Sequence, residues 1–359
     1  MNFLRENFNS FDITNDVIVK RWEAAFAVIL ILLSFTAGVS GHVPQITGAD
    51  EGIQNAVHID DPYKSWAFYG TFPNAGSVAY YQFTLETGDR LWFSVFTPDI
   101  GAASPEAVLI GPGIQSEGLI PAGVAALDNE GYLFIPGDKP VLPEYEPFTP
   151  AANYQWLEYE YIADAPGTYF IAMVNNGTGA GSYGLALGYR EEFSVPEWIM
   201  IPLSIASIRV WEGNSPAFVI GFPLLIVMFG LVYLFRAKKE PVKITTETLA
   251  GSAGGLLYIA GSLFMLIQAL MALGKTGFEA SFGVTAVFIL IPLILGCLVL
   301  RYYLRPEKKP GKYRWLKLLI LGILGLVFWA GYVIGPILVI CAGIAALFAA
   351  KNREKRASL

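Results

Sequence analysis

The stretch Val78-Ala-Tyr-Tyr-Gln-Phe-Thr-Leu-Glu-Thr-Gly-Asp-Arg-Leu-Trp-Phe-Ser-Val-Phe96 decides the fold of the first half of the chain. β-Branched and aromatic residues, which are typical of strands, stand on both sides of Glu86-Thr-Gly-Asp89. A short polar turn with a glycine between two such runs is typical of a hairpin. The sequence therefore predicts two strands, 78–85 and 91–96, that pair with each other.

The same pattern continues on both sides of this stretch. Between His42 and about Tyr189, runs rich in β-branched and aromatic residues are broken by Gly, Pro, Asn and Asp at close intervals. Further strands are expected at 107–110, 158–162, 168–174 and 182–189. Because no helical periodicity intervenes, we predict an antiparallel, jelly-roll-like β-sandwich over residues 42–197.

Two parts of this region resemble a known family. Residues 79–95, and residues 165–174 together with 181–187, look like the bacterial pre-peptidase C-terminal type of β-sandwich. The resemblance covers only part of the region, and residues 111–150 form an insertion that departs from the family. It implies an accessory, non-catalytic module of a secreted protein, with a role in binding or spacing.

Charge is divided unevenly along the chain. The 359 residues carry a formal net charge of −6, but residues 42–197 contain 20 Asp and Glu against four Lys and Arg, which leaves −16 there and a basic remainder. Basic loops beside apolar runs stay on the cytoplasmic side during insertion, so the acidic region is predicted to be extracytoplasmic. Nucleic acid is excluded as its partner, because few cations there could displace counterions from phosphates. Both cysteines, Cys297 and Cys341, lie in later apolar runs, so the acidic region has no disulfide.

Long apolar runs predict a multi-pass protein of the plasma membrane, with a helical bundle over residues 213–359. Spans are expected at 218–235, 249–273, 282–300, 315–332 and 335–350. The run 315–350 is divided because it would be about 54 Å long as one helix, against about 30 Å of hydrocarbon. A turn near 331–336 also keeps the basic C-terminus cytoplasmic. Five helices exceed what a tether needs, which favours a protein partner or a homo-oligomer in addition to membrane lipid.

Two segments flank the predicted sandwich. Residues 1–41 place Lys20-Arg21 before an apolar stretch, 24–39, and are either a cleaved signal peptide or a retained anchor helix. Residues 198–212 are too short to span a membrane and predict an amphipathic helix in the interface, with Trp198 and Trp211 at headgroup level.

Arg209, near the end of this interfacial helix, has several acidic residues within reach in the sequence. It either pairs with carboxylates that precede the helix or is hydrated. The candidate partners are Glu191, Glu192 and Glu197.

Metal binding is a second hypothesis for the outer region. If cleavage follows Gly41, the new amino terminus and imidazole of His42 could join His58 in a copper site, which resembles the histidine brace of copper-binding secreted proteins. Asp60 and Asp61 could separately hold calcium through oxygen ligands. The alternative for all four is an ordinary solvated surface.

Aromatic residues alternate with carboxylates late in the insertion, which favours either a ligand or partner surface or the packed edge of the sandwich. The residues concerned are Tyr145, Phe148, Tyr154, Trp156 and Tyr159. Asn176-Gly-Thr178 matches a glycosylation acceptor at a predicted loop tip.

Sequence motifs of enzymes are absent: there is no nucleophile elbow, phosphate-binding glycine loop or metalloprotease helix. The predicted spans hold no acidic or basic side chain near a midpoint, which disfavours transport, although a water-filled cavity at Gln268 would support it. We therefore predict a non-enzymatic membrane protein whose outer sandwich binds a ligand, glycan or partner protein. Copper binding and small-solute transport are the alternatives.

Overall fold

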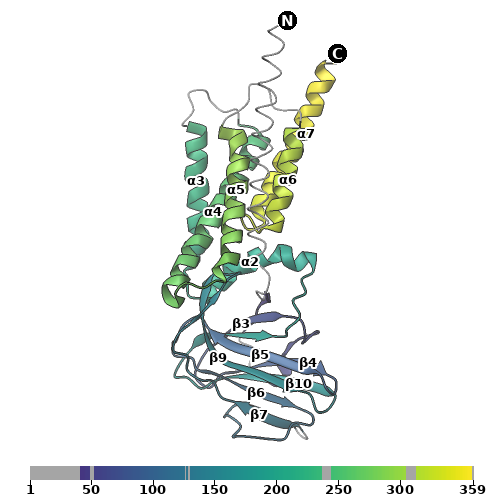
Figure 1. Ribbon diagram of the computed structural model, residues 1–359, viewed down its shortest axis with the longest axis vertical. Coiled ribbons are helices and arrows are strands. Elements are labelled where there is room, and N and C mark those ends of the chain that lie inside the picture. Colours follow the sequence, from purple (N-terminus) through teal and green to yellow (C-terminus); the bar gives the residue numbers. More distant parts are fainter. Residues whose placement is uncertain are drawn as a thin grey trace.

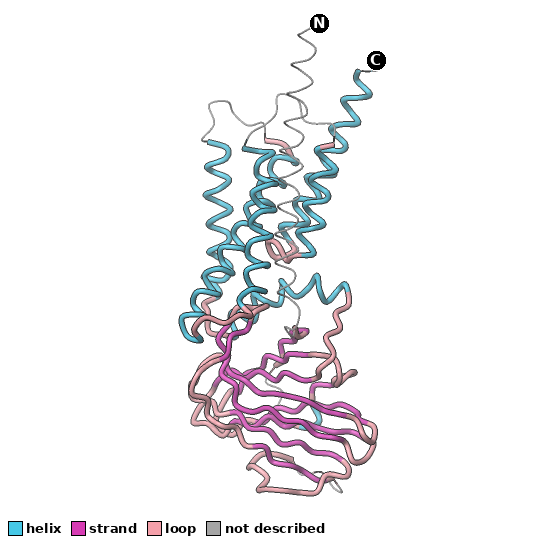
Figure 2. The backbone as a smooth tube through the Cα atoms, viewed as in Figure 1, coloured by secondary structure: helices cyan, strands magenta, loops and turns pink. Residues whose placement is uncertain are grey.

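The computed structural model describes residues 41–48, 52–125, 127, 130–236, 244–304 and 313–357. A β domain lies at one end of the molecule and a helical bundle at the other (Figures 1 and 2). Within these residues, four helices are long and apolar enough to cross a membrane, so the predicted mixed class is confirmed and the chain is a membrane protein. The predicted signal peptide or anchor, residues 1–41, lies outside the described residues except for Gly41. Residues 237–243 and 305–312, the predicted basic loops, also lie outside them.

Two sheets form the β domain. The first has the strand order β1-β3-β11-β5-β9-β8, and the second has the order β2-β4-β10-β6-β7. The first consists of β1 (Val43–Ile46), β3 (Trp66–Phe72), β11 (Gly181–Leu187), β5 (Arg90–Thr97), β9 (Ala151–Ile162) and β8 (Glu144–Glu146). The second consists of β2 (Val57–His58), β4 (Val78–Leu85), β10 (Gly167–Asn175), β6 (Pro105–Gly111) and β7 (Gly131–Ile135). Neighbouring strands are antiparallel with two exceptions: β1 runs parallel to β3, and β2 runs parallel to β4.

The predicted hairpin between 78–85 and 91–96 is wrong. Both strands form, but β4 pairs with β2 and β10, whereas β5 pairs with β9 and β11. The turn at Gly88, where φ is 89°, therefore crosses from one sheet to the other. Apolar side chains explain the crossing: Phe83 of β4 and Phe93 of β5 are both fully buried in the core between the sheets. β4 and β5 therefore face each other across the core, β5 in the first sheet and β4 in the second.

The two outer faces of the sandwich are covered differently. The first sheet packs against helix α2 (Val195–Trp211), whose Trp211 ring lies 4.9 Å from Tyr69, centroid to centroid. The second sheet is covered by part of the connection between β6 and β7, where Val124 and Leu127 pack on Tyr80. The first sheet is thus the one that faces the helices (Figure 1).

Five helices follow α2: α3 (Pro216–Arg236), α4 (Thr246–Thr276), α5 (Phe282–Leu304), α6 (Arg314–Val327) and α7 (Ile334–Ala357). Helix α4 is central and packs against α3, α5 and α7, while α6 packs against α7. The candidate spans are α3, α4, α5 and most of α7. Helix α6, with 14 residues, is about 21 Å long and too short to cross the hydrocarbon alone. The run 315–350 is therefore divided into unequal helices.

A left-handed turn separates α6 from α7. The φ angles of Trp329, Gly331, Tyr332 and Val333 are 53°, 63°, 59° and 64°. Glycine adopts this left-handed backbone conformation freely. For each of the three other residues it costs roughly 1–3 kcal/mol and needs support from neighbouring groups. The indole nitrogen of Trp329 supplies some of it by donating to the carbonyl of Trp198, 3.0 Å away. The turn is thereby fixed to α2, where the β domain meets the bundle.

Candidate functional site

The connection from β8 to β9 is inserted between the β domain and the ends of α4 and α5. The hydroxyl of Thr285, on α5, is fully buried and donates to the carbonyl of Pro147 at 2.6 Å. Tyr145 therefore donates its own hydroxyl to Thr285 Oγ1, at 2.8 Å. The Phe148 ring follows and packs 6.1 Å from Phe288 and 6.3 Å from Trp329. These contacts hold the sandwich directly on the helices.

Arg209 provides the second attachment. Only 2% of its side chain is exposed, and Nη1 donates to the carbonyl of Pro150 at 3.0 Å and to both carboxylate oxygens of Glu212 at 2.9 and 2.7 Å. Arg209 therefore pairs with Glu212, three residues away on the same turn, and not with the predicted Glu191, Glu192 or Glu197. One of them, Glu197, instead pairs with Lys64 at 2.5 Å. Burial raises the pKa of Glu212, and the nearby guanidinium opposes this effect.

Helix α2 packs against the β domain and the bundle, and its position in the membrane interface stays a prediction. It starts at Val195 because Ser194 caps it, accepting from the amide of Glu197. Trp198 Nε1 donates to the carbonyl of Val327 and Trp211 Nε1 to that of Gly70. The helix contacts the first sheet and the bundle, while Met200, Leu203 and Val210 remain exposed. Its indole N–H groups therefore bond to backbone carbonyls in place of headgroups.

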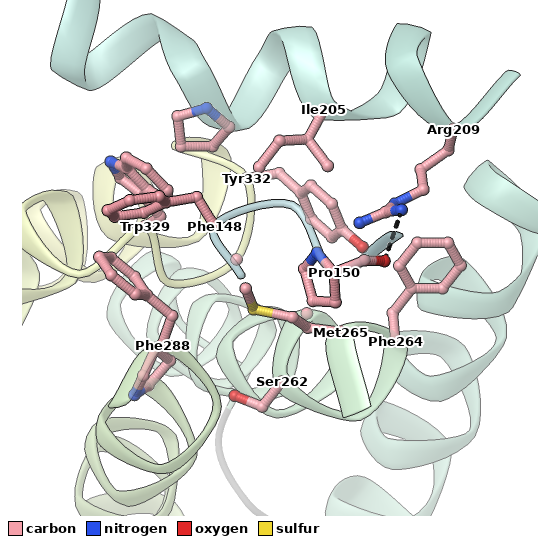
Figure 3. A pocket seen from close by; sticks show the side chains of 14 residues that line it. Phe148, Pro150, Ile205, Arg209, Ser262, Phe264, Met265, Phe288, Trp329 and Tyr332 are labelled. Carbon is pink, nitrogen blue, oxygen red and sulfur yellow. Dashed lines mark hydrogen bonds between the residues drawn. The ribbon is translucent and has the colours of Figure 1, made fainter. Parts of the chain in front are cut away.

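Two small cavities lie in this junction. The first, of about 50 Å³, is enclosed by α2, α4, α5, the α6–α7 turn and the β8–β9 connection (Figure 3). Arg209 Nε and Tyr332 Oη are buried there, and within the described ranges neither atom has a hydrogen-bond partner. A space of this size holds one or two waters. Gln268 lines neither of these two cavities, so neither of them is the water-filled cavity at Gln268 that would support transport.

The second cavity, of about 40 Å³, lies between the first sheet and α2 and contains the side chain of Glu146. One carboxylate oxygen accepts from the amide of Phe148 at 3.0 Å. Among the ion pairs of the described residues, none includes Glu146. Burial raises the pKa of Glu146 to about 7, although two backbone amides and the Arg209 charge oppose the shift.

We expect Glu146→Gln to remove a pH dependence of stability. The pKa of Glu146 is about 7 in the fold against 4.5 ordinarily, so the folded state binds this proton more tightly than the unfolded chain. The stabilisation is complete below pH 4.5 and is lost as the pH rises through 7. Its upper bound is about 3 kcal/mol. Thermal unfolding of the full chain in phosphatidylcholine nanodiscs, on both sides of that range, measures it. An undiminished pH dependence in Glu146→Gln contradicts the assignment.

The residues proposed for metal binding are not brought together. His42 precedes β1 in the first sheet, whereas His58 lies on β2 in the second. His42 Nδ1 is 2.6 Å from Ser65 Oγ, and burial lowers its pKa to about 4. Asp61 accepts from Arg190 at 2.6 Å, while Asp60 contacts His58 at 3.4 Å. No group of three or more His, Cys, Asp or Glu side chains in the described part of the chain is arranged for a metal ion.

The predicted aromatic surface is divided among several environments. Tyr145 and Phe148 are in the junction, as described above. Trp156 is 5% exposed and donates to Thr97 Oγ1 at 2.8 Å, and Tyr159 packs 6.1 Å from Phe93. Tyr154 is half-buried on β9.

Asn176, the predicted glycosylation acceptor, is exposed at the tip between β10 and β11. Its amide nitrogen donates to Glu106 Oε1 at 3.0 Å. This is the nitrogen to which a glycan would be attached, in place of one of its two hydrogens.

Several residues of the junction were not singled out from the sequence. Glu212 follows Arg209 by three residues in an otherwise apolar segment, and this spacing is a signal for an ion pair on one helical turn. Thr285 is an isolated polar residue at the start of an apolar run. Glu146, Trp329 and Tyr332 carry no comparable signal, because only the packing of distant segments makes them neighbours.

Comparison with known proteins adds little to this description. No family model matches the sequence, and no curated protein matches it. Among solved structures, a periplasmic inhibitor of g-type lysozyme, PliG from Aeromonas hydrophila, is 14% identical and aligns over 40% of this chain and 98% of its own. Its TM-score is 0.22, which carries no argument about fold or function. The resemblance to the pre-peptidase C-terminal sandwich stays a prediction.

Proposed function

We propose that this chain is a non-enzymatic binding protein of the plasma membrane, whose acidic β domain is presented outside the cell membrane to a cationic protein partner. The observation that carries the proposal is the unbalanced charge of the β domain, −16 over residues 42–197. Anionic surfaces of this kind attract cationic partners and speed their association.

Ion pairing inside the domain leaves this charge on the surface. Three of its four basic residues are paired with carboxylates of the same region: Lys64 with Glu197, Arg90 with Glu160 and Arg190 with Asp61. Of the other carboxylates that the structure describes, several are exposed and in no ion pair, among them Glu86, Asp99, Glu117 and Glu144. The electrostatic potential around the domain is therefore negative, and the carboxylates that produce it are accessible to a partner.

The attachment to the bundle supports the same role. Arg209, Tyr145 and Thr285 join the first sheet to the helices, so the opposite side of the domain, with the β6–β7 connection, faces away from them (Figure 1). Leu119 in this connection is 88% exposed and follows the exposed carboxylate of Glu117. An apolar side chain beside a carboxylate suits a basic protein surface better than an uncharged glycan.

Photo-crosslinking in intact cells tests this proposal. A photoreactive residue at position 119 is expected to give one adduct of defined mass, with the yield falling severalfold in Glu117→Lys and at high salt, because screening weakens the attraction. Glu144→Lys, an exposed carboxylate beside the helices, is the matched control and should leave the yield unchanged. An adduct that is indifferent to Glu117→Lys and to salt, or no adduct at all, contradicts a cationic partner.

A further inference from the structure

The second junction cavity combines aromatic rings with one carboxylate. Its walls come from the first sheet, α2, the α6–α7 turn and the residues before β1. The rings of Phe148, Phe193, Trp198 and Trp329 line it together with Glu146. Trp198 lies 4.7 Å from Trp329 and 5.7 Å from Phe193, between ring centroids, so the rings form one continuous wall. The π-faces of such rings attract cations.

Among the described residues, the partly buried carboxylate of Glu146 has no cation as its partner. Its known contacts are backbone amides, which bond to the charge without neutralising it. Arg209 is close enough to affect it but forms its ion pair with Glu212. A carboxylate away from water needs either a proton or a cation. The cavity beside Glu146 is where a cation could sit.

The other polar groups of the cavity do not oppose a cation. Among the described residues that line it, His42 alone is basic, and burial lowers the pKa of its imidazole to about 4, so it is neutral at physiological pH. Tyr69 and Thr149 offer hydroxyl oxygens. As far as the structure describes it, the lining thus has one carboxylate, two hydroxyl oxygens and no group that is positively charged at physiological pH.

Hydrogen bonding limits which cation fits. The oxygens of Glu146, Tyr69 and Thr149 can accept from N–H donors. A primary ammonium has three such donors, whereas the trimethylammonium of a choline headgroup has none. The cavity therefore favours a primary ammonium over a choline headgroup.

The position of the cavity indicates where the ammonium comes from. Residues of α2 and of the α6–α7 turn line it, and this turn is the end of the hairpin that meets the β domain (Figure 1). The candidate spans α3 and α7 begin at Pro216 and Ile334, next to α2 and this turn, and the ends of a span are expected at the level of the lipid headgroups. We propose that the cavity binds the primary ammonium group of an aminophospholipid, with Glu146 as its counter-ion and Trp198 and Trp329 as its aromatic wall.

Thermal unfolding of the full chain in nanodiscs of two compositions tests the site. Discs that contain phosphatidylethanolamine should raise the unfolding temperature by roughly 5 °C over pure phosphatidylcholine discs. Glu146→Gln keeps the shape of the side chain and should abolish the difference, whereas Glu144→Gln, an exposed carboxylate on the same strand, should retain it. Equal unfolding temperatures of the unmodified chain in the two discs overturn the proposal, as does a full gain in Glu146→Gln.

A second arm distinguishes the source of the ammonium. Free ethanolamine added to phosphatidylcholine discs should give little gain, because it lacks the acyl chains that hold the headgroup at the membrane. A gain equal to that of phosphatidylethanolamine, again lost in Glu146→Gln, overturns the lipid source and assigns the cavity to a soluble amine. Native mass spectrometry of the phosphatidylethanolamine discs should retain one lipid on the unmodified chain and none on Glu146→Gln.

Discussion

Arg209→Met is expected to destabilise the whole protein by about 3–5 kcal/mol, because it leaves the carboxylate of Glu212 buried without a cation. It also removes the donor to the carbonyl of Pro150, through which α2 holds the β8–β9 connection. For a chain of this size the unfolding temperature should fall on the order of 10 °C. Thermal unfolding of the full chain in nanodiscs measures the change.

A matched control separates burial from charge. Arg190→Met breaks the pair with Asp61, whose side chains are 43% and 36% exposed, and should cost less than about 1 kcal/mol. In Arg209→Met combined with Glu212→Leu, no charge is left unpaired, and much of the lost stability should return. If Arg209→Met costs no more than Arg190→Met, the guanidinium does not hold the junction together.

Gly331→Ala is expected to have the next largest effect, a loss of about 3 kcal/mol. The residue has φ of 63°, where a Cβ is disfavoured by about 1–2 kcal/mol. A Cβ there would also lie 2.9 Å from the backbone carbon of Leu257 on α4, a contact that cannot relax by rotating a side chain. The α6–α7 turn would have to move away from α4, and the unfolding temperature should fall accordingly.

Gly274→Ala is expected to stabilise the chain, in contrast to Gly331→Ala. Gly274 is helical, near the end of α4, and a Cβ there would meet nothing within 4 Å. Alanine should therefore stabilise the chain by about 0.5–1 kcal/mol. If both alanine variants shift the unfolding temperature in the same direction, the turn is not constrained as described.

Local sequence predicted the elements of the β domain better than their pairing. The strands at 78–85 and 91–96 follow from side chains that favour extended backbone, and both are present as β4 and β5. Their partners depend on which apolar faces meet across the core, and β4 and β5 find theirs far along the chain. A turn such as Glu86-Thr-Gly-Asp89 allows a hairpin or a crossing between sheets, so its residues alone do not decide between them.

The junction was the least predictable part of the molecule. Trp198 and Trp211 have the composition of an interfacial helix, and only the fold shows that their indole N–H groups donate to the backbone carbonyls of Val327 and Gly70. Tyr145 and Phe148 were predicted as part of a ligand or partner surface or of the packed edge of the sandwich, and in the fold they contact Thr285 and Phe288 of the bundle. Burial of this kind arises between segments more than a hundred residues apart, which periodicity does not reveal.

The orientation of the chain across the membrane underlies the proposed partner and is tested most directly by labelling with a membrane-impermeant maleimide. With Cys297→Ala and Cys341→Ala as background, Thr87→Cys places a thiol at the exposed β4–β5 turn, and Asn352→Cys places one at the exposed end of α7. Thr87→Cys should react in intact cells, and Asn352→Cys only after the membrane is permeabilised. Reaction of Asn352→Cys in intact cells, with Thr87→Cys protected, would contradict an acidic β domain outside the membrane.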